Sequence, residues 1–270
     1  MVMRLQALLQ HPDALPVVPE VAARLIATFG RDDVDLDSIT ADLERDPALV
    51  ARLLRQANSA LFRLLRPVHS ARDAVMVLGF NRVRALVVAA AVQSRFPAPP
   101  GMDLERFWSY SFVAASVARR VCVPRRLDDN VAFTAALLHA VGELVMHQVM
   151  PEVMRDLDRT CPWYALERAG AEYQALGYAY AEVGAALAQH WRLPRLLVQA
   201  IEQHLDPLHR ESADPLAAVV HLAAWRARVW ALGNQRDMLI HTYPDALGEL
   251  LQLDPDLLVD PDVVNPGAAR

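Results

Sequence analysis

Apolar side chains recur at spacings of three and four residues along most of this chain, which is the period of an amphipathic helix. In the first hundred residues, helix-capping signals precede short runs of this kind. The residues that open these runs are Pro19-Glu20, Asp37-Ser38, Asp46-Pro47, Ser70 and Asn81. Longer helices are predicted over Leu104–Val121, Asp129–Met150, Glu182–Trp191 and Leu216–Leu232. Because no useful stretch alternates apolar and polar residues at period two, the pattern predicts an all-α fold without a sheet.

Proline and glycine divide this helical pattern near residue 100. The sequence Pro-Ala-Pro-Pro-Gly at residues 97–101 is the clearest linker in the chain. We therefore expect two lobes, namely an N-terminal bundle of about five helices over residues 8–96 and a larger helical lobe over residues 103–250, joined by a linker at 97–102. Residues 251–270 are rich in Asp and Pro and are predicted to form a frayed acidic tail.

The composition is typical of a globular protein with a sizeable core, since 54% of the residues are hydrophobic and 22% are charged. The longest stretch without Asp, Glu or Arg runs from Asn130 to Gly142, which is too short to span a bilayer. No signal peptide is evident near the N-terminus, so we expect a soluble, cytoplasmic protein that does not insert into membranes. Cys122 and Cys161 are far apart in sequence and are expected to be buried free thiols in a reducing compartment.

Charge is distributed unevenly in a chain whose formal net charge is −5. Residues 32–46 hold seven acidic side chains, whereas residues 47–96 hold eight arginines and a single acidic residue, Asp73. Two interpretations are open: the two segments form helix faces that complement each other, or the basic segment faces a partner. For the second interpretation, the candidate partner-binding residues are Arg52, Arg55, Arg63 and Arg66. Their spacing from the apolar positions predicts that Arg52 is more exposed than Arg55.

Several catalytic motifs are absent from the sequence. There is no G-x-S-x-G, no phosphate-binding G-x-x-x-x-G-K-[ST] and no H-E-x-x-H. The chain also has no lysine, which removes Schiff-base mechanisms. His139, Glu143 and His147 are spaced four residues apart, but the two histidines would lie roughly 12 Å apart along one helix. One metal ion cannot easily bind both, so we interpret this stripe as the edge of the core.

Ten different short motifs follow one another along the chain. In the first part of the chain these are Leu15-Pro16, Asp46-Pro47-Ala48-Leu49, Ala57-Asn58-Ser59-Ala60, Ser70-Ala71-Arg72-Asp73 and Leu78-Gly79-Phe80. The second part adds Phe107–Ser111, Leu137–Gly142, Val183–Leu187, His190–Pro194 and Ile201–His204. In order and spacing, this series resembles the HDOD (HD-related output domain) family of bacterial signalling proteins, over about residues 8–225. No receiver, cyclase or phosphodiesterase module accompanies these motifs, so the resemblance implies a stand-alone HDOD protein.

The resemblance also implies that the ligands of an ancestral metal site are largely lost. The parent HD superfamily consists of metal-dependent phosphohydrolases, which use a His, a His-Asp pair and a later Asp. In this sequence the corresponding positions are Tyr110, His139, Ala140 and Ala224, and two auxiliary histidine positions fall at Tyr180 and His204-Leu205. Of the core ligands only His139 remains, and a lone imidazole binds a first-row metal weakly. The resemblance therefore implies an HD-like larger lobe with a degenerate site and no catalytic residue, bound metal or cofactor.

Three functions remain open for a chain with these features. The first is a non-catalytic output or adaptor domain that contacts an unidentified protein partner, a role that the resemblance links to cyclic-dinucleotide signalling in bacteria. The second is a residual HD-type phosphohydrolase acting on a nucleotide, which needs ligands that the sequence lacks. The third is DNA binding through a helix-turn-helix-like pair within residues 38–66. Because the second helix of that pair begins with apolar residues at 47–50, nucleic acid is disfavoured as a partner.

Overall fold

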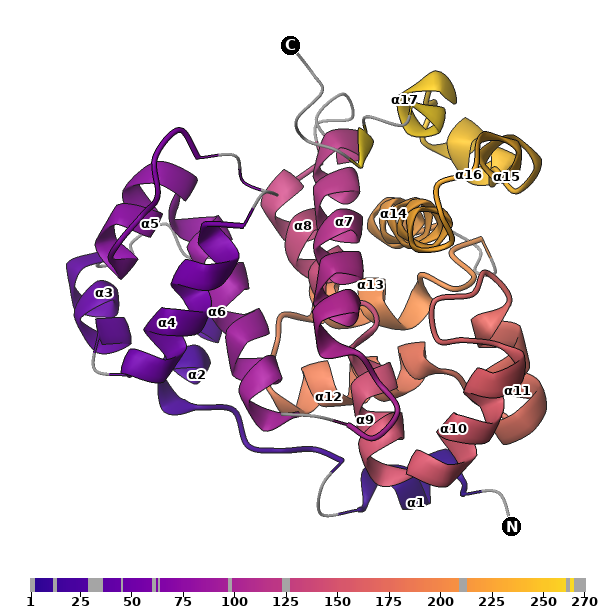
Figure 1. Ribbon diagram of the computed structural model, residues 1–270, viewed down its shortest axis with the longest axis horizontal. Coiled ribbons are helices and arrows are strands. Elements are labelled where there is room, and N and C mark those ends of the chain that lie inside the picture. Colours follow the sequence, from indigo (N-terminus) through magenta and orange to yellow (C-terminus); the bar gives the residue numbers. More distant parts are fainter. Residues whose placement is uncertain are drawn as a thin grey trace.

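The helices form two groups, a smaller one at the left of Figure 1 and a larger one arranged around α7 (Leu104–Cys122). The computed structural model describes residues 3–11, 14–28, 36–44, 46–59, 62, 64–96, 99–122, 127–208, 213–260 and 263–264. Within these ranges the chain forms helices and no strand, so the fold is all-α, as the sequence predicts. No helix in the described ranges combines the length and apolar character that a membrane span needs.

The smaller group consists of five helices, of which α4 and α5 begin at a side-chain cap. They are α2 (Glu20–Ile26), α3 (Leu36–Glu44), α4 (Pro47–Ala57), α5 (Ala71–Leu78) and α6 (Phe80–Arg95). At the start of α4, the carboxylate of Asp46 accepts a hydrogen bond from the backbone N–H of Leu49 at 3.0 Å. At the start of α5, Ser70 Oγ accepts one from the N–H of Asp73 at 3.0 Å. These side chains satisfy backbone donors that have no partner within the helix itself.

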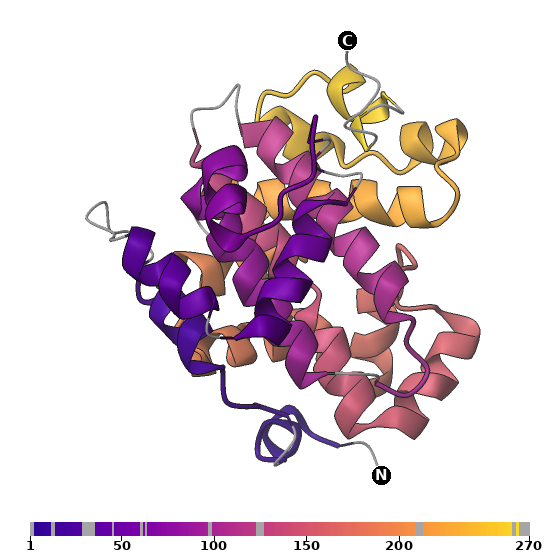
Figure 2. The ribbon, with the colours of Figure 1, turned by 60° about the vertical axis from the view of Figure 1, so that its left-hand side comes forward.

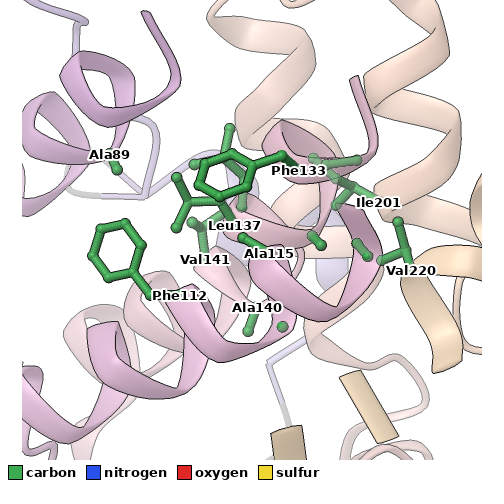
Figure 3. Packing of buried hydrophobic residues seen from close by; sticks show 14 of the residues in the cluster. Ala89, Phe112, Ala115, Phe133, Leu137, Ala140, Val141, Ile201 and Val220 are labelled. Carbon is green, nitrogen blue, oxygen red and sulfur yellow. The ribbon is translucent and has the colours of Figure 1, made fainter. Parts of the chain in front are cut away.

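The larger group builds the main core of the molecule. Its helices are α1 (Leu5–Leu9), α7, α8 (Asp129–Leu138), α9 (Val141–Val149), α10 (Pro151–Thr160), α11 (Arg168–Leu176), α12 (Tyr180–His190), α13 (Arg195–Gln203) and α14 (Pro215–Ala231), followed by the short α15 (Arg236–His241), α16 (Asp245–Leu250) and α17 (Asp256–Val259). α7 packs along α8 and α14, while α12 packs on α9 and α13. Figure 3 shows apolar side chains from these helices meeting, among them Phe133, Leu137 and Ile201.

α6 joins the two groups, and its composition explains how. Its residues from Val83 to Val92 are all buried, which is the pattern of a helix covered on every side. α2, α4 and α5 cover it from within the smaller group, and α8 contacts it from the larger group. The apolar positions of α6 therefore connect the two hydrophobic interiors into one cluster.

The segment from Asp129 to Met150 does not form the single helix that its apolar pattern predicts. The helix breaks at His139-Ala140 and gives α8 and α9. Nearly every residue of both helices is buried, so the apolar pattern contains no amphipathic signal that would reveal the break. Beyond the break, α9 crosses α12 at Gly142, where a Cβ atom would overlap the carbonyl oxygen of Tyr180. The crossing therefore requires glycine.

The first described residues lie against the larger group, although the sequence assigns residues from 8 onward to the smaller one. Figure 2 shows α1 apart from the other N-terminal helices, at the end of an extended segment. α1 packs on α12, and the hydroxyl of Tyr178 donates to the carbonyl of Met3 at 3.1 Å. Trp191 Nε1 donates to the carbonyl of Pro16 at 2.7 Å. These hydrogen bonds cross about 175 residues of sequence, which local patterning cannot anticipate.

The C-terminal segment is also more ordered than its composition predicts. Instead of fraying from residue 251, the chain forms α17 and buries Leu258 and Val263 in the core. Arg226 on α14 donates from Nε to the carbonyl of Leu258 at 2.8 Å. The apolar residues between the acidic positions thus fix this part of the chain, so the prediction of a frayed tail is wrong for the described residues. Cys122 is a buried free thiol, as predicted, whereas Cys161 is a free thiol that is only half-buried, because it lies at the end of α10.

Candidate functional site

The first two HD positions, Tyr110 on α7 and His139 at the end of α8, are in direct contact. The hydroxyl of Tyr110 donates to His139 Nε2 at 2.7 Å, and His139 Nδ1 donates to the carbonyl of Ala136 at 2.6 Å. Because a carbonyl oxygen only accepts, this arrangement fixes one neutral tautomer and occupies both ring nitrogens. Burial, with a contribution from the positive charge of Arg228, lowers the pKa of His139 to about 3. The ring is therefore neutral at physiological pH.

A second tyrosine–histidine pair lies next to the first and repeats its arrangement. The hydroxyl of Tyr180, at the start of α12, donates to His204 Nε2 at 3.0 Å, while His204 Nδ1 donates to the carbonyl of Ile201 at 2.7 Å. The imidazole rings of His139 and His204 meet edge to face, with their centroids 5.3 Å apart. Burial and the neighbouring His139 hold the pKa of His204 well below its usual range. The structure thus brings together four of the positions that the resemblance singles out.

A buried arginine on α14 completes this cluster. Arg228 is 5% exposed, and its Nη1 donates to the carbonyl oxygens of Trp163 at 3.0 Å and Ala165 at 2.5 Å. Its Nη2 donates to the hydroxyl of Tyr180 at 2.9 Å. The guanidinium carbon lies 5.8 Å from the ring centroid of Tyr110 and 5.4 Å from that of Tyr180. A permanent positive charge therefore stands among the side chains at the former metal positions.

These residues do not fit the metal ion that the HD superfamily uses. Ala140 and Ala224, which the resemblance assigns to the carboxylate positions, are both buried, and Ala140 is packed among apolar side chains (Figure 3). The one remaining ligand, His139, has both nitrogens engaged, and the guanidinium of Arg228 would repel a cation. Across the part of the chain that the structure describes, no group of three or more His, Cys, Asp or Glu side chains could hold a metal ion.

Arg228 was not among the site residues predicted from the sequence, although the sequence around it is unusual. The run Trp225-Arg226-Ala227-Arg228-Val229 places two charged residues in a helix that is otherwise apolar. Charged side chains in such a helix are seldom buried unless something pairs with them. This unusual pattern could have marked Arg228 as a candidate functional residue, but nothing in the sequence indicates that it reaches Tyr110 and Tyr180.

An open cavity of about 370 Å³ lies beside Arg228. Tyr180, His204 and Ala224 line it together with His221 and Trp225. His221 Nδ1 donates to the carbonyl of His204 at 2.7 Å, and burial lowers the pKa of His221. Trp225 Nε1 donates to Thr242 Oγ1 at 2.9 Å, which fixes the indole in the cavity wall. The degenerate site is therefore accessible from outside through a cavity of defined shape.

Glu143 and His147, the rest of the predicted stripe, belong to a separate buried cluster around Arg168. Arg168 donates from Nε and Nη2 to the two carboxylate oxygens of Glu143, each at 3.1 Å. It also donates from Nε to Glu172 at 2.7 Å and from Nη1 to Asp158 at 2.7 Å. Asp158 binds His147 Nε2 at 2.9 Å. These carboxylates are therefore engaged by an arginine, which agrees with the interpretation of the stripe as part of the core.

The Arg168 cluster is connected to the degenerate site through α12. Glu172 Oε2 accepts a hydrogen bond from the backbone N–H of Tyr180 at 2.8 Å, which positions the tyrosine at the start of α12. Burial, reinforced by the nearby Glu143, raises the pKa of Glu172 well above its ordinary value. Burial lowers the pKa of His147, but the hydrogen bond to Asp158 and the charge of Glu143 outweigh it, and the net shift is upward.

The four arginines proposed from the sequence as a partner-binding set are not equally placed. Arg55 and Arg66 are exposed, Arg52 is half-buried, and Arg63 lies outside the described residues. The prediction that Arg52 is more exposed than Arg55 is therefore wrong, because α4 buries the side of the helix on which Leu49 and Leu53 lie, next to Arg52. One complementary pair does form between the basic and acidic segments: Arg72 donates to Asp37 at 2.7 Å on the surface.

Exposed apolar side chains surround Arg66. Leu65 is fully exposed, Met76 is 78% exposed, and Val77 on the same helix is also exposed. A surface hollow of about 430 Å³ is lined by Arg66, Met76 and Val77. Asn58 shapes this region, because its side chain accepts from the N–H of Val68 at 2.8 Å and donates to the carbonyl of Val68 at 2.9 Å. We call Leu65, Arg66, Met76 and Val77 the α5 patch.

Comparisons with known proteins agree with this architecture. A crystal structure from Shewanella amazonensis, named a candidate phosphohydrolase, is 31% identical, with a TM-score of 0.75 over 93% of this chain and 91% of that one. A crystal structure from Marinobacter aquaeolei, named a candidate signal transduction protein, is 26% identical, with a TM-score of 0.75 over 96% of this chain and 57% of that one. An uncharacterized protein of Treponema pallidum is 26% identical over 221 residues, which cover 78% of this chain and only 42% of that protein. The family model of the HDOD domain matches residues 15–207, and the chain therefore belongs to the HDOD family.

Proposed function

We propose that this HDOD protein is a non-catalytic signalling domain that acts in the bacterial cytoplasm by binding a protein partner. The proposal rests on the side chains found at the HD positions and on the hydrogen bonds that they make. Arg228 places a fixed cation next to Tyr110 and Tyr180, and the hydrogen bonds of His139 leave neither ring nitrogen available. Without a metal or a carboxylate at these positions, nothing there activates water for hydrolysis.

The alternative of a residual phosphohydrolase receives support from the name of the Shewanella relative described above. That relative is similar in fold and sequence, but fold similarity by itself does not transfer an activity. In this chain, hydrolysis would require His139 to exchange the hydroxyl of Tyr110 for a metal ion, with alanine at both carboxylate positions. The side chains present therefore favour a binding function.

The α5 patch is the surface that we propose for the partner. Arginine and methionine are enriched at protein interfaces, and contiguous exposed apolar side chains mark interaction sites. Arg66 lies within the patch, and Arg55 is a second exposed arginine in the same group of helices. An acidic segment with an apolar anchor would complement this combination of charge and apolar surface.

DNA binding is a weaker alternative on the same helices. A recognition helix reads base edges with polar side chains near its N-terminus. The exposed residues at the start of α4 are Pro47 and Ala48, which offer no side-chain donor or acceptor, and the next residue, Leu49, is buried. This surface has nothing with which to read a base sequence.

A hydrolysis assay tests the non-catalytic part of the proposal. The purified chain is incubated with Mn²⁺ or Fe²⁺ and with nucleotides or cyclic dinucleotides, and His139→Ala serves as the matched control. We expect no turnover above the control with any substrate. Turnover by the wild-type chain that His139→Ala abolishes would contradict the proposal.

A capture experiment tests the partner surface. Met76→Glu places a charge in the α5 patch, while Val153→Glu places one at an exposed apolar position on α10, outside the patch. Each variant and the wild type are used to capture proteins from the native cytosol. We expect Met76→Glu to lose a partner that both other proteins retain, and equal capture by all three would refute the surface assignment.

A further inference from the structure

Arg228 is a buried cation to which the protein supplies only neutral hydrogen-bond partners. Its guanidinium bonds to two carbonyl oxygens and to the hydroxyl of Tyr180. Among the described residues, no carboxylate lies within ion-pair distance of it. A guanidinium has five N–H donors, and these hydrogen bonds use three of them. The charge of Glu143 acts on Arg228 only from beyond ion-pair distance, so a group of opposite charge in direct contact would stabilise this site further.

The neighbouring arginine on α14, Arg226, bonds to a different part of the chain. Arg226 is also buried, but it donates to the carbonyl of Leu258 near the C-terminal end of α17. Helix C-termini carry partial negative charge, and the charge of Asp260 acts on Arg226 in the same sense. Arg226 does not line the cavity, whereas Arg228 does. Of the two buried arginines on α14, Arg228 is therefore the one that faces open space.

The other ionisable groups of the cavity leave its interior positive. Burial lowers the pKa of His204 and of His221, so both rings are neutral at pH 7. The one carboxylate that lines the cavity, that of Glu167, is exposed at its edge, where water screens its charge. Arg228 thus dominates the electrostatic potential at the base of the cavity.

The size and walls of the cavity define the rest of a ligand. A cavity of roughly 150 Å³ holds a benzene ring, so about 370 Å³ has room for one ring and an anionic group. Leu166, Leu205 and Trp225 supply apolar and aromatic surface to its walls. Small-molecule sites typically combine such walls with a few polar groups that fix orientation.

We propose that this cavity binds a small molecule with an apolar or aromatic ring and one oxyanion, a phosphate or a carboxylate, which Arg228 holds. The planar guanidinium suits either group, because both present two oxygens side by side. The ligand would occupy the degenerate HD site without being hydrolysed there. This inference goes beyond the proposed function, since partner binding at the α5 patch does not require it.

Isothermal titration calorimetry on the full chain at pH 7 and low salt tests the proposal. The probes are phenyl phosphate and benzoate, with benzyl alcohol as the ring without charge and inorganic phosphate as the charge without ring. We expect saturable binding of one phenyl phosphate or one benzoate per chain, and weaker binding of the two partial probes. The oxyanion probe that binds more tightly identifies the natural ligand as a phosphate or a carboxylate.

Matched variants connect that binding to the cavity. Arg228→Gln should weaken binding at least about tenfold, the loss expected for a charge-assisted hydrogen bond, while Arg226→Gln should leave it unchanged. Ala169→Trp fills the cavity without altering its charge and should abolish binding. If circular dichroism shows that Arg228→Gln does not fold, Ala169→Trp decides the question. Failure of both oxyanion probes to bind at millimolar concentration, or wild-type binding by the folded cavity variants, would overturn the proposal.

Discussion

Replacing Arg168 by methionine should destabilise the protein more than any surface substitution. The side chain is fully buried and makes five hydrogen bonds, four of them to carboxylates and one to the carbonyl of Cys161. Methionine has a similar length but no charge and no donors. Arg168→Met therefore leaves Glu143 and Glu172, both fully buried, without their counter-charge.

The expected magnitude follows from this geometry. Removing one partner of a buried ion pair costs about 3–5 kcal/mol, because the other charge stays buried and unpaired. For a protein of this size, each kcal/mol lowers Tm by roughly 2–4 °C, so Arg168→Met should lower it by roughly 6–20 °C. Part of this loss should be recovered by Glu143→Gln in the Arg168→Met background, since that change removes one of the two stranded carboxylates.

Urea unfolding at pH 7, followed by circular dichroism, measures these effects. Arg159→Met is the matched control, because Arg159 pairs with Asp156 at 2.9 Å while both side chains are more than 70% exposed. Exposed pairs contribute about 0–1 kcal/mol, so the control should unfold almost as the wild type does. A loss below about 1 kcal/mol for Arg168→Met, or no recovery in the double variant, would refute the reasoning.

Three further predictions concern the site and its surroundings. Folding lowers the pKa of His139 from about 6.5 to about 3, so the contribution of its neutral ring to the free energy of unfolding should be lost as pH falls from 6.5 towards 3, by up to about 1.4 kcal/mol per pH unit. The urea midpoints of the wild type and of His139→Gln should therefore converge over that range. A constant difference between them would contradict this. Asn58→Ala removes both hydrogen bonds to Val68 and should expose the intervening loop, so limited proteolysis should cut it faster than in the wild type, and equal cleavage would contradict the role of Asn58. Gly142→Ala should force α9 away from the backbone of Tyr180 and lower Tm, whereas Gly170→Ala, which has open space, should not; equal Tm values would contradict the crossing geometry.

Sequence patterns predicted the fold class because helix caps and apolar periodicity are local. The cap at Asp46 and the cap at Ser70 were visible in the sequence and form as expected. The break at His139 was not predictable, because α8 and α9 are apolar on nearly all sides and present no periodic signal.

The candidate site, too, could be predicted only where local sequence patterns report on it. Tyr110, His139, Ala140 and Ala224 could be assigned from motif order, since each lies in a recognisable segment. The role of Arg228 depends on contacts with Trp163 and Tyr180, which are 65 and 48 residues away, and no local pattern encodes them. Arg168 was missed for the same reason, because its partners come from three different helices.

Calorimetric titration of Mn²⁺ into the metal-free chain tests the central claim most directly. Arg228 and the hydrogen bond between Tyr110 and His139 both oppose a cation at the HD positions. We therefore expect no saturable binding at micromolar Mn²⁺, and identical traces for the wild type and for His139→Ala. Binding of one Mn²⁺ per chain with micromolar affinity, lost in His139→Ala, would contradict the claim that this HDOD protein has given up metal chemistry.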